Sequence, residues 1–220
     1  MWVDYKKYKH HTLLEELTVA LQEDYKEWVA VYKPDHDGIC VWRYEYEDPN
    51  TVQLEKDPDN LLYELPDSPL EIDHKDSWWA IGLFFTREFV AANKFPGYWL
   101  RSKLILEKMP GMHQAIVNFI VPHGLIPMHE DRGSWARIEQ DLNRKVSGYT
   151  AVVVIDYPSE DVREVGFRFV GEPQGRGFKT GDVFAFEGRV HAHEVWNFTD
   201  KWRVTCVIDI DESEWNNVVG

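Results

Sequence analysis

His129 and Asp131 offer an imidazole and a carboxylate two residues apart. In an extended segment, side chains at this spacing point the same way, so both groups could converge on one metal ion. An imidazole nitrogen and a carboxylate oxygen are two of the three ligands in the facial triad of non-haem iron(II) oxygenases. A His-x-Asp triplet is common by chance, however, so the hypothesis needs a third ligand.

The third ligand is expected from a histidine on a later strand, and the segment His191-Ala192-His193 offers two. Both histidines would lie on one face of an extended segment. Periodicity therefore does not choose between His191 and His193.

Arg203 lies ten residues beyond His193 in an apolar, strand-like run. One face of that strand would hold Val204, Cys206, Ile208 and Ile210, and the other Arg203, Thr205, Val207 and Asp209. A guanidinium in so apolar a strand needs an anionic partner, and its planar fork matches a dicarboxylate. An ion pair with Asp182, Glu194 or Asp209 is an equally good alternative.

From Pro110 onward, these residues resemble the aspartyl/asparaginyl β-hydroxylase family of 2-oxoglutarate-dependent oxygenases. The resemblance covers roughly residues 98–211, and its most specific part is His193-Glu194-Val195-Trp196-Asn197 followed by Arg203. It implies that His193 binds iron(II) together with His129 and Asp131. It also implies that Arg203 binds the distal carboxylate of the cosubstrate 2-oxoglutarate, in a double-stranded β-helix with the metal at its open end.

Asp131 and two further positions depart from the family pattern. Animal aspartyl hydroxylases lack the carboxylate ligand, whereas Asp131 is similar to the ligand of the bacterial branches and of most 2-oxoglutarate oxygenases. The Arg-x-His pair that usually follows the first ligand is missing, so we expect Tyr149 or Thr150 to replace it. Asn118 falls where the family carries a serine that contacts the cosubstrate, and Thr205 is expected to join the cosubstrate-binding residues beside Arg203.

Residues 132–147 form an insertion-like stretch directly after Asp131. It would either shape substrate access or form a surface loop. The side chains concerned are Trp135, Arg137, Asn143 and Arg144.

The chain is expected to be mainly β with some α structure, forming a jelly-roll, cupin-like core. Apolar periodicity predicts helices over residues 12–29 and 98–108. Residues 47–76 are rich in Asp, Glu, Pro and Asn and are expected to form a long surface excursion. Short β-rich runs predict strands at 40–46, 113–122, 149–157, 165–170, 182–187, 193–198 and 202–210, and the aromatic-rich run 78–89 predicts a strand followed by a turn. We expect a single domain over 1–220, with a helical and mixed cover at 1–95 and the oxygenase core at 96–211.

A net charge of −14 disfavours nucleic acids and anionic membranes as partners. No apolar run is long enough to span a bilayer and the first residues lack a signal-peptide core, so a cytoplasmic location is expected. Cys40 and Cys206 are far apart in apolar surroundings, which favours buried free thiols.

Three functions fit these residues. The first is an iron(II)- and 2-oxoglutarate-dependent hydroxylase of Asp or Asn side chains in a polypeptide, or of a related small molecule or lipid. The second is a cupin-like metalloenzyme that uses no keto acid. The third is a non-catalytic jelly-roll binding module.

Overall fold

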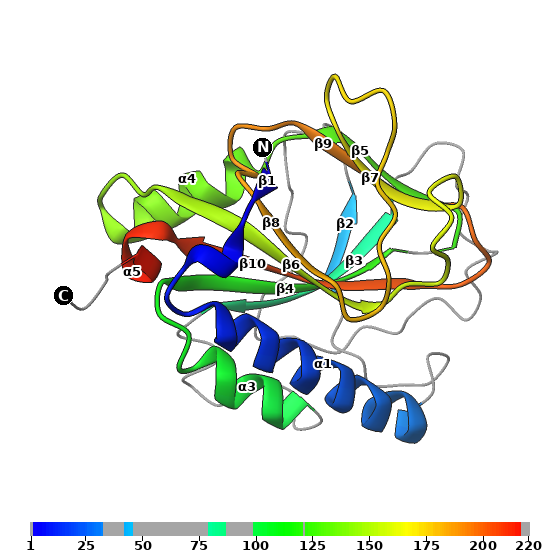
Figure 1. The fold of residues 1–220 in the computed structure, drawn as a ribbon, viewed down its shortest axis with the longest axis horizontal. Coiled ribbons are helices and arrows are strands. Elements are labelled where there is room, and N and C mark those ends of the chain that lie inside the picture. The colour runs from blue at the N-terminus through cyan, green and yellow to red at the C-terminus, as the bar shows by residue number, and fades with distance from the viewer. Residues whose placement is uncertain (1, 33–41, 46–78, 87–98, 121, 217–220) are drawn as a thin grey trace.

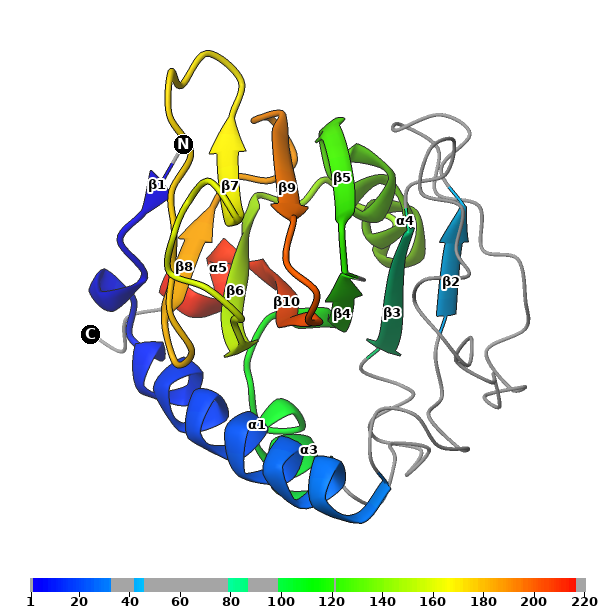
Figure 2. The same cartoon turned by 90° about the vertical axis from the view of Figure 1, so that its right-hand side faces the viewer.

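A computed structural model of the chain describes residues 2–32, 42–45, 79–86, 99–120 and 122–216. Two antiparallel sheets face each other in a jelly roll, as Figures 1 and 2 show. The larger sheet has the order β1 (Trp2–Val3), β8 (Val183–Phe186), β6 (Gly148–Asp156), β10 (Arg203–Asp211), β4 (Met112–Ile120), β3 (Trp79–Thr86), β2 (Trp42–Glu45). The smaller sheet has the order β5 (Gly124–His129), β9 (His193–Asn197), β7 (Val165–Phe169).

Two helices cover the outer face of the larger sheet. The long helix α1 (His11–Tyr32) lies beside α3 (Leu100–Leu106) in both views. Leu14, Leu17 and Leu21 are fully buried on one side of α1, at the spacing that places side chains on one helix face. The remaining helices are η1 (Tyr5–Lys7), α4 (Arg132–Leu142) and α5 (Glu212–Asn216).

The two central strands divide their side chains between two cores. On β6, Ala151, Val153 and Ile155 join the cluster beneath the helices, whereas Val152 and Val154 join the cluster between the sheets. On β10, the apolar face of Val204, Cys206, Ile208 and Ile210 likewise lies in the helix-side cluster. This alternation follows from the two-residue period of a strand, and it directs Arg203 toward the space between the sheets.

The jelly-roll prediction is confirmed, and within the described residues so are both helices and the strands expected from residue 78 onward. Five elements were not predicted as such: β1, η1, β5, α5 and the helix α4, which occupies most of the stretch interpreted as an insertion. The polar segment 47–76 lies outside the described residues, and the strand expected at 40–46 is described only over β2. The predicted boundary near residue 95 stays a prediction, although β1, β2 and β3 all belong to the larger sheet.

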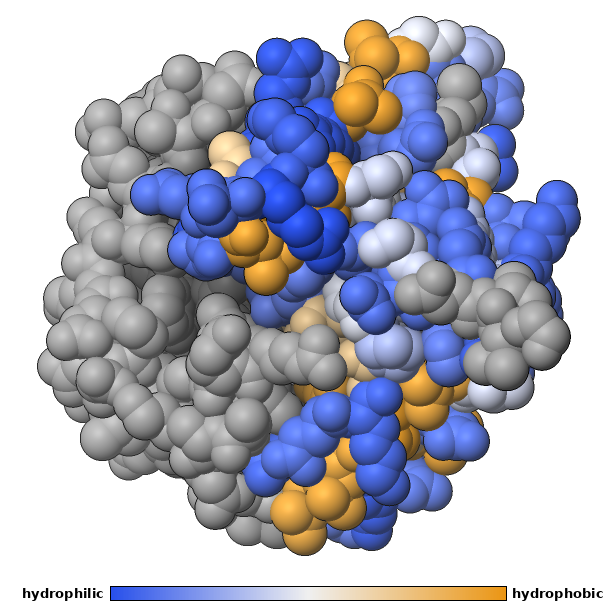
Figure 3. Space-filling view, turned by 90° about the vertical axis from the view of Figure 1, so that its left-hand side faces the viewer, coloured by the Kyte–Doolittle hydropathy of each residue, from blue (hydrophilic) through white to orange (hydrophobic). Residues whose placement is uncertain are grey.

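The surface drawn in Figure 3 is mostly hydrophilic over its described residues, and hydrophobic residues form small separate patches. Within the described part of the chain, no helix combines the length and apolarity needed to cross a membrane.

The packing of α1 predicts that Leu17→Ala lowers the free energy of unfolding by about 2–5 kcal/mol, because it leaves a cavity in the helix-side core. Urea unfolding of the variant measures this loss. The matched control is Val19→Ala on the same helix, where the side chain is 55% exposed and a change within about 0.5 kcal/mol is expected. Equal losses in the two variants would contradict the assigned helix orientation.

Candidate metal centre

His129 and His193 meet because the strands that carry them are paired. In the register of β5 with β9, the Cα atom of His129 lies opposite that of His193. Their ring centroids are 4.4 Å apart. Two imidazoles more than sixty residues apart in the sequence thus lie side by side at the edge of the space between the two sheets.

A β-bulge aims His129 into this space. The register shifts between Ile126 and His129, so that β5 uses three residue steps where β9 uses two. Ile126 and His129 both line the pocket, although an odd spacing would place them on opposite faces of a regular strand. Pro127 lies within the bulge, and proline, which has no backbone N–H, is tolerated at bulges in a sheet.

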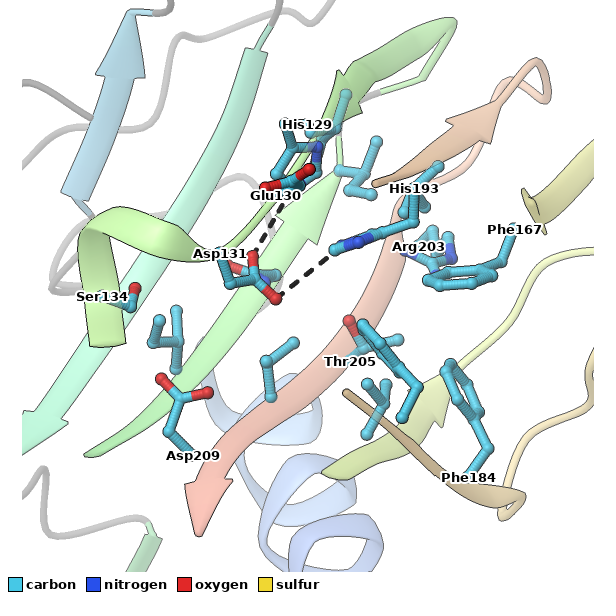
Figure 4. A pocket seen from close by; sticks show the side chains of 18 of the residues that line it. His129, Glu130, Asp131, Ser134, Phe167, Phe184, His193, Arg203, Thr205 and Asp209 are labelled. Atoms are coloured by element: carbon cyan, nitrogen blue, oxygen red, sulfur yellow. Dashed lines mark ion pairs between the residues drawn. The ribbon is translucent and has the colours of Figure 1, made fainter. Parts of the chain in front are cut away.

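Asp131 lies directly before α4, where the chain leaves β5. Its backbone N–H donates to the carbonyl of Gly188 over 3.0 Å. Its side chain makes no capping hydrogen bond within the described residues, and Figure 4 shows it pointing between the two histidines. The carboxylate oxygens lie 3.6 Å from His129 Nε2 and 3.9 Å from His193 Nε2.

The protein fixes both imidazole rings through their other nitrogen. His129 Nδ1 lies 2.7 Å from the carbonyl oxygen of Pro127, and His193 Nδ1 lies 3.0 Å from that of His191. A carbonyl accepts but does not donate, so each Nδ1 carries the proton and each Nε2 presents a lone pair toward Asp131. Metal-binding histidines are commonly oriented in this way. The three candidate ligand atoms all lie within 4.8 Å of one another.

Aromatic side chains surround His193. Its ring stacks on Phe167 at 5.2 Å and meets the edge of Phe186 at 4.8 Å. Burial lowers the pKa of His193 to about 4, although the Asp131 carboxylate acts in the opposite direction. His193 is therefore neutral at physiological pH, which is the form that binds a metal.

Gly188 leaves the space that the Asp131 carboxylate occupies. A Cβ atom at Gly188 would lie 2.2 Å from Asp131 Oδ2 and 2.7 Å from Thr150 Oγ1. Real Cβ atoms essentially never approach so closely. The glycine therefore allows the carboxylate to reach the two imidazoles.

Arg203 lies in the same pocket, almost fully buried at 3% exposure. Among the described residues, no carboxylate pairs with its guanidinium and no group accepts a hydrogen bond from its Nε. The three intramolecular partners weighed from the sequence are engaged elsewhere: Glu194 by Arg168, Asp182 by the Lys179 N–H, and Asp209 by Gln114 and Thr150. The guanidinium lies over the aromatic ring of Tyr157, with its Cζ atom 5.3 Å from the ring centroid.

Of the other residues expected to bind the cosubstrate, two line the pocket and one lies in the helix-side core. Asn118 and Thr205 are paired across β4 and β10 and both line the pocket next to Arg203. Tyr149 instead faces the helices, stacked on Tyr8 at 5.0 Å, because alternation along β6 turns it away from the pocket. Its placement gives no support to the expected role in cosubstrate binding.

Thr150 and His191 also lie outside the ligand cluster. Thr150 donates to Asp209 Oδ1 over 3.1 Å, and His191 Nε2 lies 3.0 Å from Glu187. Of the two histidines that the sequence left open, His193 is the one in the cluster with His129 and Asp131.

Two residues of the site were not identified from the sequence. Gly188 gave no signal, because its role depends on a contact with Asp131 across the fold. Asp209 was treated only as an ion-pair partner for Arg203, yet it lines the pocket itself, as Figure 4 shows. Burial raises the pKa of Asp209 to about 7, and the charge of Asp131 acts in the same direction.

Comparisons with known proteins give similarities at the level of solved structures. No family model matches the sequence, and no curated protein matches it either. AviO1 from Streptomyces viridochromogenes is 10% identical, with 89% of this chain and 84% of that chain covered and a TM-score of 0.44. An oxidoreductase of the 2OG-Fe(II) oxygenase family from Burkholderia pseudomallei is 14% identical, with 66% and 72% covered and a TM-score of 0.41. A predicted oxalate decarboxylase from Thermotoga maritima is 12% identical, with 60% and 81% covered and a TM-score of 0.36.

The tight contact at Gly188 predicts that Gly188→Ala weakens the binding of a divalent cation by about 10- to 100-fold, because the new methyl group displaces the Asp131 carboxylate. Titration with Co²⁺ under anaerobic conditions, followed by its visible absorption, measures the affinity. Gly133→Ala is the matched control, since a Cβ atom there meets nothing within 4 Å. Unchanged Co²⁺ affinity in Gly188→Ala would show that Asp131 does not need this space.

Proposed function

We propose that the protein is an iron(II)- and 2-oxoglutarate-dependent oxygenase that hydroxylates its substrate. The observation that carries the proposal is the combination of two features in one pocket. One is a cluster of two imidazoles and one carboxylate, and the other is a buried guanidinium without an anionic partner among the described residues. A metal site alone would fit many enzymes, whereas the unpaired Arg203 specifies an anionic ligand as well.

The donor set of the cluster fits iron(II). Two neutral imidazoles and one carboxylate form a facial triad, which leaves the remaining coordination positions open. His129, Asp131 and His193 would hold the metal, with the lone pairs of both Nε2 atoms already directed at the carboxylate side. When bound, iron(II) and 2-oxoglutarate supply oxidative decarboxylation of the keto acid coupled to hydroxylation of a substrate C–H bond.

Arg203 would bind the far carboxylate of 2-oxoglutarate. Its planar fork donates two parallel hydrogen bonds to a carboxylate, and burial strengthens this interaction because little water competes. Thr205 and Asn118 lie next to it on the pocket face and can donate further hydrogen bonds. The aromatic wall of Phe167, Phe184 and Phe186 excludes water from the same space.

Within this class, we place the chain nearest the aspartyl/asparaginyl β-hydroxylases. The basis is the His193-Glu194-Val195-Trp196-Asn197 string, with Arg203 ten residues after its histidine. A substrate that is a polypeptide side chain or a small molecule fits this proposal. The cupin-like alternative without a keto acid keeps the same metal ligands, and Arg203 would then bind the substrate, because no carboxylate of the described residues pairs with it.

Asp131→Ala is expected to lower iron(II) affinity by more than about 100-fold and to abolish conversion of 2-oxoglutarate to succinate, because it removes one of three ligands. Anaerobic iron titration and succinate assays measure both effects. Asp141→Ala, at an exposed position of α4, should leave both unchanged. Full turnover in Asp131→Ala would mean that the ligands are assigned wrongly.

Arg203→Met is expected to have two opposite effects. The affinity for 2-oxoglutarate should fall roughly 30-fold or more, because a buried charge-assisted pair is lost, while metal affinity is retained. The free energy of unfolding without 2-oxoglutarate should rise by about 1–4 kcal/mol, because an unpaired buried charge is replaced by an apolar group of similar volume.

Calorimetric titration with 2-oxoglutarate and urea unfolding test these two effects. Arg163→Met, at an exposed arginine, serves as the control and should change neither quantity. Unchanged cosubstrate affinity would contradict the role of Arg203, and a large loss of stability would instead indicate a structural role.

A further inference from the structure

The pocket face of the larger sheet has two polar ends with an apolar belt between them. Arg203 and Thr205 of β10 form one end together with Asn118 of β4. Val207, its β4 partner Ile116 and its β6 partner Val152 form the belt. Beyond the belt lies the acidic end, which we define as Asp209, its β4 partner Gln114 and its β6 partner Thr150.

The two ends are too far apart to serve one small ligand. Arg203 and Asp209 are separated by six residues of extended strand, or about 20 Å. Figure 4 shows them on opposite sides of the pocket, with Asp131 and the two histidines above the space between. A dicarboxylate held by Arg203 and the metal cluster leaves the acidic end free.

Two hydrogen bonds from neighbouring strands fix the carboxylate of Asp209. Gln114 Nε2 donates to one of its oxygens and Thr150 Oγ1 to the other. Gln114 is itself fixed by a hydrogen bond from Arg137 of α4. Because each carboxylate oxygen can accept two hydrogen bonds, one donor on each leaves acceptor capacity for a ligand in the pocket that Asp209 lines.

The charges at this end select the ligand. No arginine or lysine of the described residues lies within ion-pair distance of Asp209. The charge of Arg137, which is hydrogen-bonded to Gln114, acts on Asp209 more weakly than the charge of the Asp131 carboxylate in the same pocket. A second carboxylate brought here would be repelled and would lose its hydration, whereas a hydroxyl or an ammonium donates the hydrogen bond that the site lacks.

We infer that Asp209 binds the substrate through a hydrogen-bond-donating head group, a hydroxyl or an ammonium, and that the acidic end excludes a carboxylate. This inference rests on the proposed function, since the ligand is the molecule to be hydroxylated. It narrows the proposed substrates: a free aspartyl carboxylate does not fit this end, whereas an amide NH₂, an amine or an alcohol does.

The test is an NMR titration of the ¹⁵N-labelled protein, loaded with Zn²⁺ and 2-oxoglutarate, with three probes of equal carbon number: glycerol, propane-1,3-diamine and malonate. The side-chain amide of Gln114 is the reporter, because it donates directly to Asp209. Saturable shifts of this resonance with glycerol or the diamine, and none with malonate, are expected. The two donors separate a hydroxyl ligand from an ammonium ligand.

Asp209→Asn removes the charge at nearly constant volume and should weaken binding of the effective probe at least about tenfold. Asp200→Asn, at a carboxylate that is 92% exposed, is the matched control and should behave as the unmodified protein does. If Asp209→Asn does not fold, the preference of the unmodified protein for glycerol or the diamine over malonate still tests the inference. Equal binding of malonate, or no binding of either donor, overturns the inference.

The same titration separates this inference from the proposed function. Binding of 2-oxoglutarate without binding of either donor refutes the role of Asp209 alone. Binding of a donor to a protein that does not bind 2-oxoglutarate refutes the cosubstrate proposal while the acidic end stands.

Discussion

The pairing of β5 with β9 is the constraint on which the site depends. It sets His129 opposite His193, and two backbone carbonyls fix the rings: that of Pro127 within β5 and that of His191 two residues before the start of β9. A shift of this register by one residue would turn one imidazole to the other face of the sheet. Asp131 joins them only because β5 ends at His129 and the chain turns into α4 within two residues.

Side-chain directions could be predicted from the sequence where the alternation of a strand determines them. The two faces of β10 follow directly from its pattern, and so does the direction in which Arg203 points. The bulge around Pro127 was not predictable, because it depends on the partner strand rather than on local preference. The helix α4 was missed because only Trp135 and Ile138 of its eleven residues are buried, which gives a weak apolar period, and because Gly133 and Ser134 suggest a loop.

Contacts across the fold set the remaining features of the site. Gly188 matters through Asp131, and Asp209 through Gln114 and Thr150, none of which is near in the sequence. Arg203 adds a charge that the protein buries without an anionic partner among the described residues, which costs stability. Proteins commonly tolerate such local penalties where a ligand later satisfies the group.

Strand β10 also fixes the distance between the two polar ends of the pocket. It carries Arg203 near one end and Asp209 near the other, and an extended backbone that is hydrogen-bonded to β4 and β6 on both sides can hardly stretch. The interval between the two ends is therefore constant. In a molecule whose head group binds Asp209, the atom that reaches the His129–Asp131–His193 cluster is the one whose distance from the head group equals the distance from Asp209 to the cluster. The length of the molecule, as well as the polarity of its head group, would therefore determine which carbon reacts.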